Sequence, residues 1–171
     1  MPSKARRDAE FSDFVHQASP ELLRIAWYLT GDAHRANDLV QASLVKTYLT
    51  WSRITPGSAI GYVRRVMVNE NIDQWRRHGA EVLVDEVTDF DRQTPSDDIG
   101  RFAETQALVT ALRHLPPQQR RVVVLRYYCD LSEQQVAHEL GIGRGAVKSN
   151  ASRGLAALRH HIAEQELAHE H

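Results

Sequence analysis

Hydrophobic residues recur at steps of three and four in the first part of the chain, as on one face of an α-helix. This spacing predicts a first helix, which Pro20 breaks or kinks, and then a turn at Thr30–Asp32. The apolar face of this helix consists of Phe11, Phe14, Val15, Ala18, Leu22, Ile25, Ala26 and Leu29.

Two further helices are predicted before residue 79. The second ends in the loop ITPGS near Ile54, and its buried side is Ala36, Leu39, Val40, Leu44, Tyr48 and Leu49. The third runs from about Ser58 to Arg77, with Ile60, Val63, Val66, Met67 and Trp75 in helical phase.

The periodicity fails between Gly79 and Glu104, where the chain is acidic and polar and contains Pro95. Such a segment buries too little apolar surface to offset its ordering entropy, so it is predicted to be a tether. Two uses are open: a solvated linker between domains, or a negatively charged strand that occupies a basic channel of a partner.

A second helical module is predicted from about Phe102. Its first helix has an apolar face of Ala107, Leu108, Ala111, Leu112 and Leu115. Pro117 suits the first turn of the next helix. The apolar face of that helix is Val122, Val123, Leu125 and Cys129. Because Cys129 is the single cysteine, no internal disulfide forms and a reducing cytoplasm is expected. A core thiol is favoured for Cys129 over a redox role.

The stretch Ser132–Arg153 predicts a helix–turn–helix. Ser132 and Gln135 can form a capping box, and Gly141 suits a left-handed helix end. The last helix buries Val147, Ala151, Leu155, Leu158 and Ile162, and it turns Ser149, Ser152 and Arg153 outward, with Lys148 and Arg159 on a flank. Hydroxyls and cations on an exposed helix face suit the major groove of DNA. The alternative is a surface helix pair with ordinary charges.

Composition and charge narrow the class of protein. The 171 residues are 42% hydrophobic, which suffices for one or two small cores. No apolar run approaches the roughly 18 residues of a membrane span, and the charged start MPSKARRDAE does not resemble a signal peptide. Net charge is +3 over residues 1–78, −6 over 79–104 and +2 over 105–171, which permits nucleic-acid binding by the two flanking segments.

Longer stretches resemble a known family. Region 2 of bacterial sigma factors is similar to DAHRANDLVQASLVKTYLTW (32–51) followed by AIGYVRRVMVNENIDQWRRH (59–78). Region 4 is similar to LRHLPPQQRRVVVLRYYCDLSEQQVAHELGIGRGAVKSNASRGLAALR (112–159). The order, without a large domain between them, resembles the extracytoplasmic-function (ECF) class, and especially the small sigma-E-like factors of actinobacteria. The resemblance implies an all-α fold with region 2 at 1–78, a flexible acidic linker at 79–104 and region 4 at 105–171.

The resemblance also implies a surface that binds core RNA polymerase. In the family, the helix carrying DLVQ binds the clamp helices of the β′ subunit. Asp38 and Gln41 match this motif, and Leu39 and Val45 are included in the expected surface. Ala42 stands where the family usually has Glu, so one polar contact is expected to be missing.

In the family, the next loop and helix read and open the minus-ten element; they map to 54–59 and 62–77. Asn69 matches an asparagine that helps to hold a base flipped out of the non-template strand. Tyr62 and Trp75 either pack a base or belong to the core, and Asp73 is expected to orient an arginine. The arginines expected to bind the strand's phosphates are Arg64, Arg65, Arg76 and Arg77.

Region 4 of the family reads the minus-thirty-five element with its last helix. The residues expected to contact this element are Arg144, Lys148, Ser149, Ser152 and Arg153. Four residues depart from the family's motif: Gly143, Ala146, Asn150 and Gly154. Because they remove a cap, a hydroxyl and a cation, weaker or altered binding of this element is expected.

The expected partners are the β and β′ subunits of core polymerase, promoter DNA and an anti-sigma factor, for which the apolar flank of the helix 39–49 is a docking surface. No catalytic residue is expected, because polymerase performs the chemistry. No cofactor, metal site or membrane insertion is expected either. The alternatives are a stand-alone helix–turn–helix regulator and a hydrolase or metal enzyme. The loose tail cluster of His160, His161, His169 and His171 can bind zinc adventitiously or be a plain polar tail.

Overall fold

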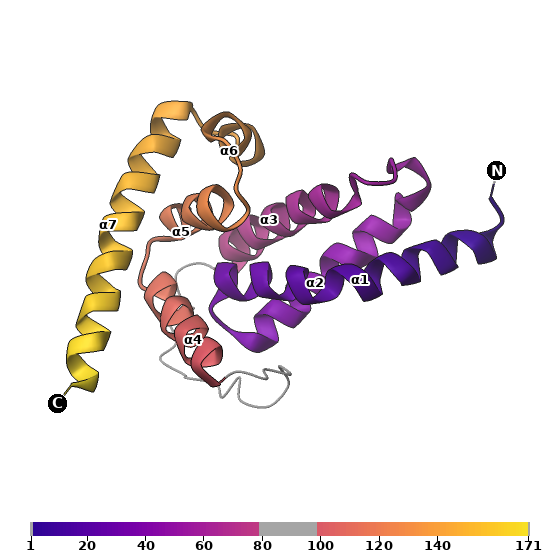
Figure 1. Ribbon diagram of the computed structural model, residues 1–171. Helices are drawn as coiled ribbons and strands as arrows, with labels where there is room; N and C mark the ends of the chain where they lie inside the picture. Colours follow the sequence, from indigo (N-terminus) through magenta and orange to yellow (C-terminus); the bar gives the residue numbers. More distant parts are fainter. Residues whose placement is uncertain (1, 79–98, 171) are drawn as a thin grey trace. The chain divides into compact units, whose positions relative to one another are not determined.

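The computed structural model describes residues 2–78 and 99–170, and in the second range it describes side chains from Glu104 onward (Figure 1). The described residues are almost entirely helical and contain no strand, which confirms the predicted all-α class. The α-helices are α1 (Lys4–Thr30), α2 (Ala33–Leu49), α3 (Ala59–His78), α4 (Ile99–Arg113), α5 (Pro117–Val123), α6 (Glu133–Leu140) and α7 (Arg144–His169). A 3₁₀ turn spans Trp51–Arg53, and a π-helical turn spans Val124–Tyr128.

The chain divides into two compact units. Most of α1 together with α2 and α3 forms the first unit, and α4 to α7 form the second; the last turn of α1, Trp27–Thr30, is grouped with the second. The tether predicted at 79–104 lies mostly outside the described residues. Helix α4 begins inside this range, at Ile99.

In the first unit, α2 packs along α3. Of the two effects predicted for Pro20, a break or a kink, the break does not occur: α1 continues to Thr30 with Pro20 inside it. A proline removes one backbone hydrogen bond, but the residues on both sides of Pro20 hold the helix in place because Ala18, Leu22 and Ile25 are buried. The predicted turn is confirmed, since Gly31 adopts a φ of 71° between α1 and α2.

Three residues predicted to be buried in this unit are exposed instead. Tyr48 is 40% exposed, Leu49 is 75% exposed and Trp75 is 45% exposed. Each lies in the last turns of its helix, where the partner helix no longer covers the apolar face. The other predicted core positions of α2, from Ala36 to Leu44, are buried.

The second unit is built on the contacts that α7 makes with α4, α5 and α6. Pro117 begins α5, as predicted. The guanidinium of Arg120 donates hydrogen bonds to the carbonyls of Leu112 (2.9 Å), Arg113 (3.2 Å) and Leu115 (3.1 Å), at and beyond the end of α4. A helix end leaves such carbonyls without intrahelical donors, so this arginine closes α4. Burial, then the charges of Arg121 and Arg113, lower the pKa of Arg120 to about 10.

The helix–turn–helix forms as the sequence predicts. The N–H of Gln135 donates to Oγ of Ser132 (3.1 Å), and the N–H of Ser132 donates to Oε1 of Gln135 (2.8 Å). Gly141 ends α6 with a φ of 65°. Cys129 differs from its predicted core position: it is half-buried, because the π-helical turn before it shifts its helical phase.

Candidate functional site

The outer face of α2 carries the first set of predicted site residues. At about 100° per residue, Asp38, Gln41, Val45 and Leu49 fall on one side of the helix, and all four are exposed. Leu39 lies on the opposite side and is fully buried, so we leave it out of the candidate surface. Val45 is 60% exposed, so with Leu49 this surface combines an apolar stripe with a carboxylate and an amide.

The exposed face of α3 carries the second set. Tyr62, Arg65, Asn69, Asp73 and Arg76 follow one another at steps of three and four and therefore share one side of the helix. All but Tyr62 are exposed. The hydroxyl of Tyr62 is 3.0 Å from Oγ1 of Thr50, which anchors its ring beside the preceding loop. This face of α3 thus presents the amide of Asn69, the carboxylate of Asp73 and the cations of Arg65 and Arg76.

The remaining predicted residues of α3 lie elsewhere on the helix. Arg64 is partly buried, and Trp75 projects on a side well away from Asn69. Arg77 borders the face, with its guanidinium 4.0 Å from a carboxylate oxygen of Glu70. Trp75 and Asn69 therefore face different sides of α3.

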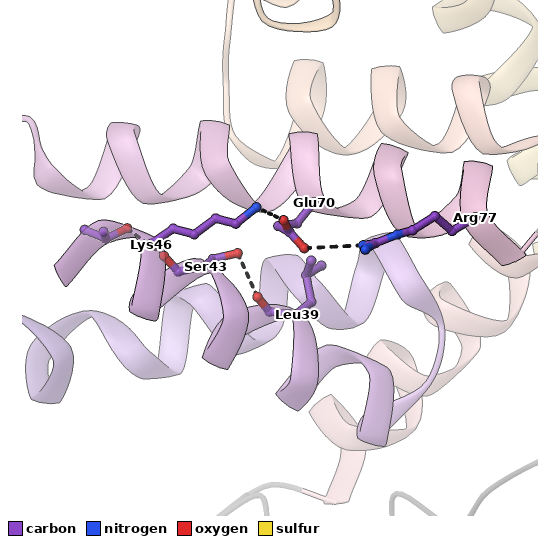
Figure 2. Close-up of polar contacts among 6 residues, drawn as sticks. Leu39, Ser43, Lys46, Glu70 and Arg77 are labelled. Atoms are coloured by element: carbon purple, nitrogen blue, oxygen red, sulfur yellow. Dashed lines mark hydrogen bonds and ion pairs between the residues drawn. The ribbon is translucent and has the colours of Figure 1, made fainter. Parts of the chain in front are cut away.

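Glu70 is a residue that the sequence analysis did not single out. It is 6% exposed, and its carboxylate lies between the ammonium of Lys46 in α2 and the guanidinium of Arg77 (Figure 2). Beside it, the buried hydroxyl of Ser43 donates to the carbonyl of Leu39 at 2.7 Å. The sequence does contain a sign of its burial. Glu70 lies seven residues after Val63 and three after Met67, so it falls on the same buried side of the helix.

A second feature missed from the sequence is an aromatic cluster of Phe11, Phe14, Tyr48 and Trp51. Ring centroids of Phe11 and Tyr48, of Phe11 and Trp51, and of Phe14 and Trp51 are each 5.2 Å apart. The hydroxyl of Tyr48 also donates to Asp8 (2.7 Å), and this bond, followed by burial, raises the pKa of Tyr48 above its usual 10. The cluster fastens the first half of α1 to the end of α2, next to the loop 54–58.

The outer face of α7 carries the third set. Ser149, Ser152 and Arg153 are exposed opposite the stripe that contains Val147 and Ala151, as predicted. Arg144 lies at the exposed start of the helix, and its N-cap, Gly143, provides no side-chain hydrogen bond. Nζ of Lys148 is 3.9 Å from Oε2 of Glu133 in α6, so part of its charge is already paired.

Two of the departures in α7 have a visible structural role. The side-chain amide of Asn150 donates to the carbonyl of Ala146 (2.8 Å), one turn back along α7. Gly154 is buried, and an added Cβ would lie 2.6 Å from Cγ2 of Val123. The close approach of α5 therefore favours a residue without a Cβ at position 154.

Metal binding and membrane insertion can be examined over the described residues. Within residues 2–78 and 99–170 no group of three or more His, Cys, Asp and Glu side chains could hold a metal ion. Nε2 of His160 lies 3.0 Å from Oε1 of Glu164, and His161 packs edge-on against His114 with ring centroids 4.7 Å apart. Of the helices described, none is long and apolar enough to cross a membrane.

Comparison with known proteins finds two family models on this chain. Residues 14–81 match sigma-70 region 2, and residues 105–158 match sigma-70 region 4. The chain is 37% identical to the RNA polymerase sigma-E factor of Streptomyces avermitilis over 160 residues, which are 92% of this chain and 88% of that protein. It is 25% identical to the ECF RNA polymerase sigma factor SigW of Bacillus subtilis, over 91% of this chain and 90% of that protein.

Solved structures of similar fold include sigma factors. The sigma factor RpoE of Bartonella quintana, solved in complex with the anti-sigma factor NepR, superposes with a TM-score of 0.70 at 25% identity, over 90% of this chain and 97% of that one. CnrH, solved in complex with the cytosolic domain of CnrY, superposes with a TM-score of 0.60 at 20% identity, over 89% of this chain and 86% of that one, and so supports the fold.

Proposed function

The chain belongs to the sigma factors of bacterial RNA polymerase, within their ECF class, and from this premise we propose how its exposed faces divide the work. As a sigma factor it binds core polymerase and directs initiation at specific promoters; the family is not one of enzymes. The observation that carries this function is that regions 2 and 4 occur in one chain, in that order. We place its action in the cytoplasm, where core polymerase and promoter DNA are found.

The exposed face of α2 binds core polymerase. Asp38, Gln41 and Val45 supply a carboxylate, an amide and an apolar side chain on one accessible side. Partly apolar surfaces with a few polar groups are suited to partner proteins. The same stripe, extended by Tyr48 and Leu49, is where an anti-sigma factor docks; the complex of the similar Bartonella sigma factor with NepR supports such a partner.

The α3 face, with the loop before it, reads and opens the minus-ten element. Asn69 binds the Watson–Crick edge of a flipped base, because an amide can both donate and accept hydrogen bonds. Arg65 and Arg76 bind backbone phosphates on either side of it along the helix. Asp73, one turn beyond Asn69, orients a neighbouring arginine. Arg77 lies at the margin of the face, whereas Arg64 is partly buried on another side of α3 and is left out of it.

The α7 face reads the minus-thirty-five element in the major groove. Arg153 and Ser149 contact base edges, while Arg144, Lys148 and Ser152 contact phosphates or bases at the margin. Binding by this module alone is weak, since Lys148 is partly paired with Glu133 and Asn150 bonds to its own helix.

A transcription assay with core polymerase and a library of short templates tests the function. We expect discrete start sites that share two upstream elements. Asn69→Ala should abolish most initiation, while the exposed amide variant Gln17→Ala in α1 should match the unchanged chain. Tight duplex binding without polymerase, together with no transcripts and no co-elution with core polymerase, would favour a stand-alone regulator instead.

A further inference from the structure

The carboxylate of Glu70 lies where the packing of α2 on α3 leaves almost no room for water. Its side chain is 8% exposed. A buried carboxylate is unfavourable unless cations and hydrogen bonds replace the water that it loses. Lys46 and Arg77 provide this replacement, one from each helix (Figure 2).

Both cations belong to helices that carry a proposed functional face. Lys46 directly follows Val45 on α2, and Arg77 directly follows Arg76 on α3. Glu70 itself directly follows Asn69. One buried carboxylate therefore connects the helix proposed to hold polymerase with the helix proposed to read the promoter.

The other contacts between these helices restrict sliding less. Leu39, Val63 and Met67 are buried apolar side chains, and apolar contacts are non-directional. A charged hydrogen bond has a narrow range of favourable distances and angles, so it selects one longitudinal position. In coiled coils, a single buried polar side chain, such as an asparagine at a core position, fixes the register of the packed helices.

We propose that Glu70 is a positioning residue that sets how far α3 is advanced along α2, and so places Asn69 correctly relative to the polymerase-bound face. This inference rests on the proposed function. It assigns to Glu70 no contact with DNA or with polymerase; its effect passes through the placement of α3.

The variant Glu70→Gln tests this role because it keeps the size of the side chain and removes its charge. Promoter opening by the holoenzyme is measured with a fluorescent base placed in the minus-ten element. We expect Glu70→Gln to slow this opening by on the order of tenfold, because small displacements of a positioned group have large effects on rate. Affinity for core polymerase should stay within about twofold, because the outer face of α2 is untouched.

A matched variant separates positioning from loss of stability. Val63→Ala removes buried methyl groups from the same face of α3 without touching the ion pair. Assayed well below both melting temperatures, it should open promoters at nearly the normal rate. Equal slowing by both variants would overturn the proposal.

Lys46, the exposed partner of Glu70, provides a second test. Lys46 is half exposed, so Lys46→Met is expected to fold. It should slow opening, and the double variant with Glu70→Gln should be no slower than Glu70→Gln alone. Losses that simply add would show that the two residues act separately, against the proposal.

The role of Glu70 in positioning α3 can also be tested on the free protein, without polymerase. Spin labels at Gln41→Cys and Arg65→Cys, with Cys129→Ser, report the placement of α3 on α2. Glu70→Gln should shift or broaden their distance distribution, and Val63→Ala should not; an unchanged distribution would overturn the proposal. If the unchanged chain opens no promoter with core polymerase, the proposed function fails, whereas the label distances still decide the role of Glu70 in register.

Discussion

Gly154 of α7 lies directly against Val123 of α5. An alanine Cβ there would lie 2.6 Å from Cγ2 of Val123 and 3.5 Å from Cβ of Gln119. Alanine favours a helix interior over glycine by about 1 kcal/mol, but overpacking at this contact costs about 1–3 kcal/mol. We expect Gly154→Ala to lower the free energy of unfolding, measured in urea.

Gly145 provides the control in the same helix. An added Cβ at Gly145 meets no atom within 4 Å. Gly145→Ala should therefore leave stability unchanged or raise it by up to about 1 kcal/mol. If the two alanine variants unfold at the same urea concentration, the packing of α5 on α7 is looser than described.

His114 makes the second unit sensitive to acid. Burial lowers the pKa of His114 below its usual 6.5, and the charges of His161, Arg113 and Arg120 lower it further, against the opposing effect of Glu164. The unfolded chain therefore binds the proton more readily than the folded one. The stabilisation is complete above about pH 6.5 and is lost as pH falls through the lower folded pKa.

We expect His114→Gln to reduce the difference in unfolding midpoint between pH 7.5 and pH 5.0. The midpoint is to be followed by backbone amide signals of α4 and α7. His34→Gln, an exposed histidine of the first unit, serves as the comparison. A pH dependence of the second unit that is identical in both variants would rule out His114 as its source.

Among the helices, α2 shows what periodicity cannot decide. It has apolar residues on two sides: Leu39, Val40 and Leu44 are buried, whereas Val45 and Leu49 are exposed. The three-and-four spacing predicts the helix correctly, but it assigned Tyr48 and Leu49 to the core. Which apolar side faces inward depends on where α1 and α3 end, and no local pattern contains that information.

The pair of Glu133 and Lys148 joins the two helices of the helix–turn–helix. If α7 binds DNA as proposed, Glu133→Gln should free Lys148 for a phosphate and tighten binding of the minus-thirty-five element by about threefold at low salt, since exposed charge pairs contribute about 0.2–1 kcal/mol. Holoenzyme binding in a salt titration measures this. Glu166→Gln, far along α7, should change nothing; equal affinities for both variants would show that the pair does not restrain Lys148.

At the scale of the whole chain, the sequence predicted the all-α class, the helix–turn–helix and the outward faces of α3 and α7. It did not predict pairs of residues distant in sequence, such as Asp8 with Tyr48 or Lys46 with Glu70. Nor did it predict the π-helical turn, which moves Cys129 out of phase. Capping boxes and helical faces are local patterns, whereas these features depend on how complete helices meet.

The acidic segment 79–104 gives a prediction that rests on its sequence. It carries a net charge of −6 over residues 79–104. If this charge occupies a polymerase channel that later holds RNA, replacing Asp85, Glu86, Asp89 and Asp91 with amides should change the ratio of abortive to full-length RNA. Gel analysis of initiation products measures this ratio; an unchanged ratio would support a plain linker.

Helix α7 runs without interruption from Arg144 to His169. At about 1.5 Å per residue it is a rod roughly 39 Å long, with the proposed reading face at one end and the exposed Leu167 near the other. Because α7 packs against α4, α5 and α6, a molecule that bound near Leu167 and shifted α7 as a rigid body would also displace Lys148 and Ser149. DNA binding by the proposed face would then respond to a partner that touches no DNA.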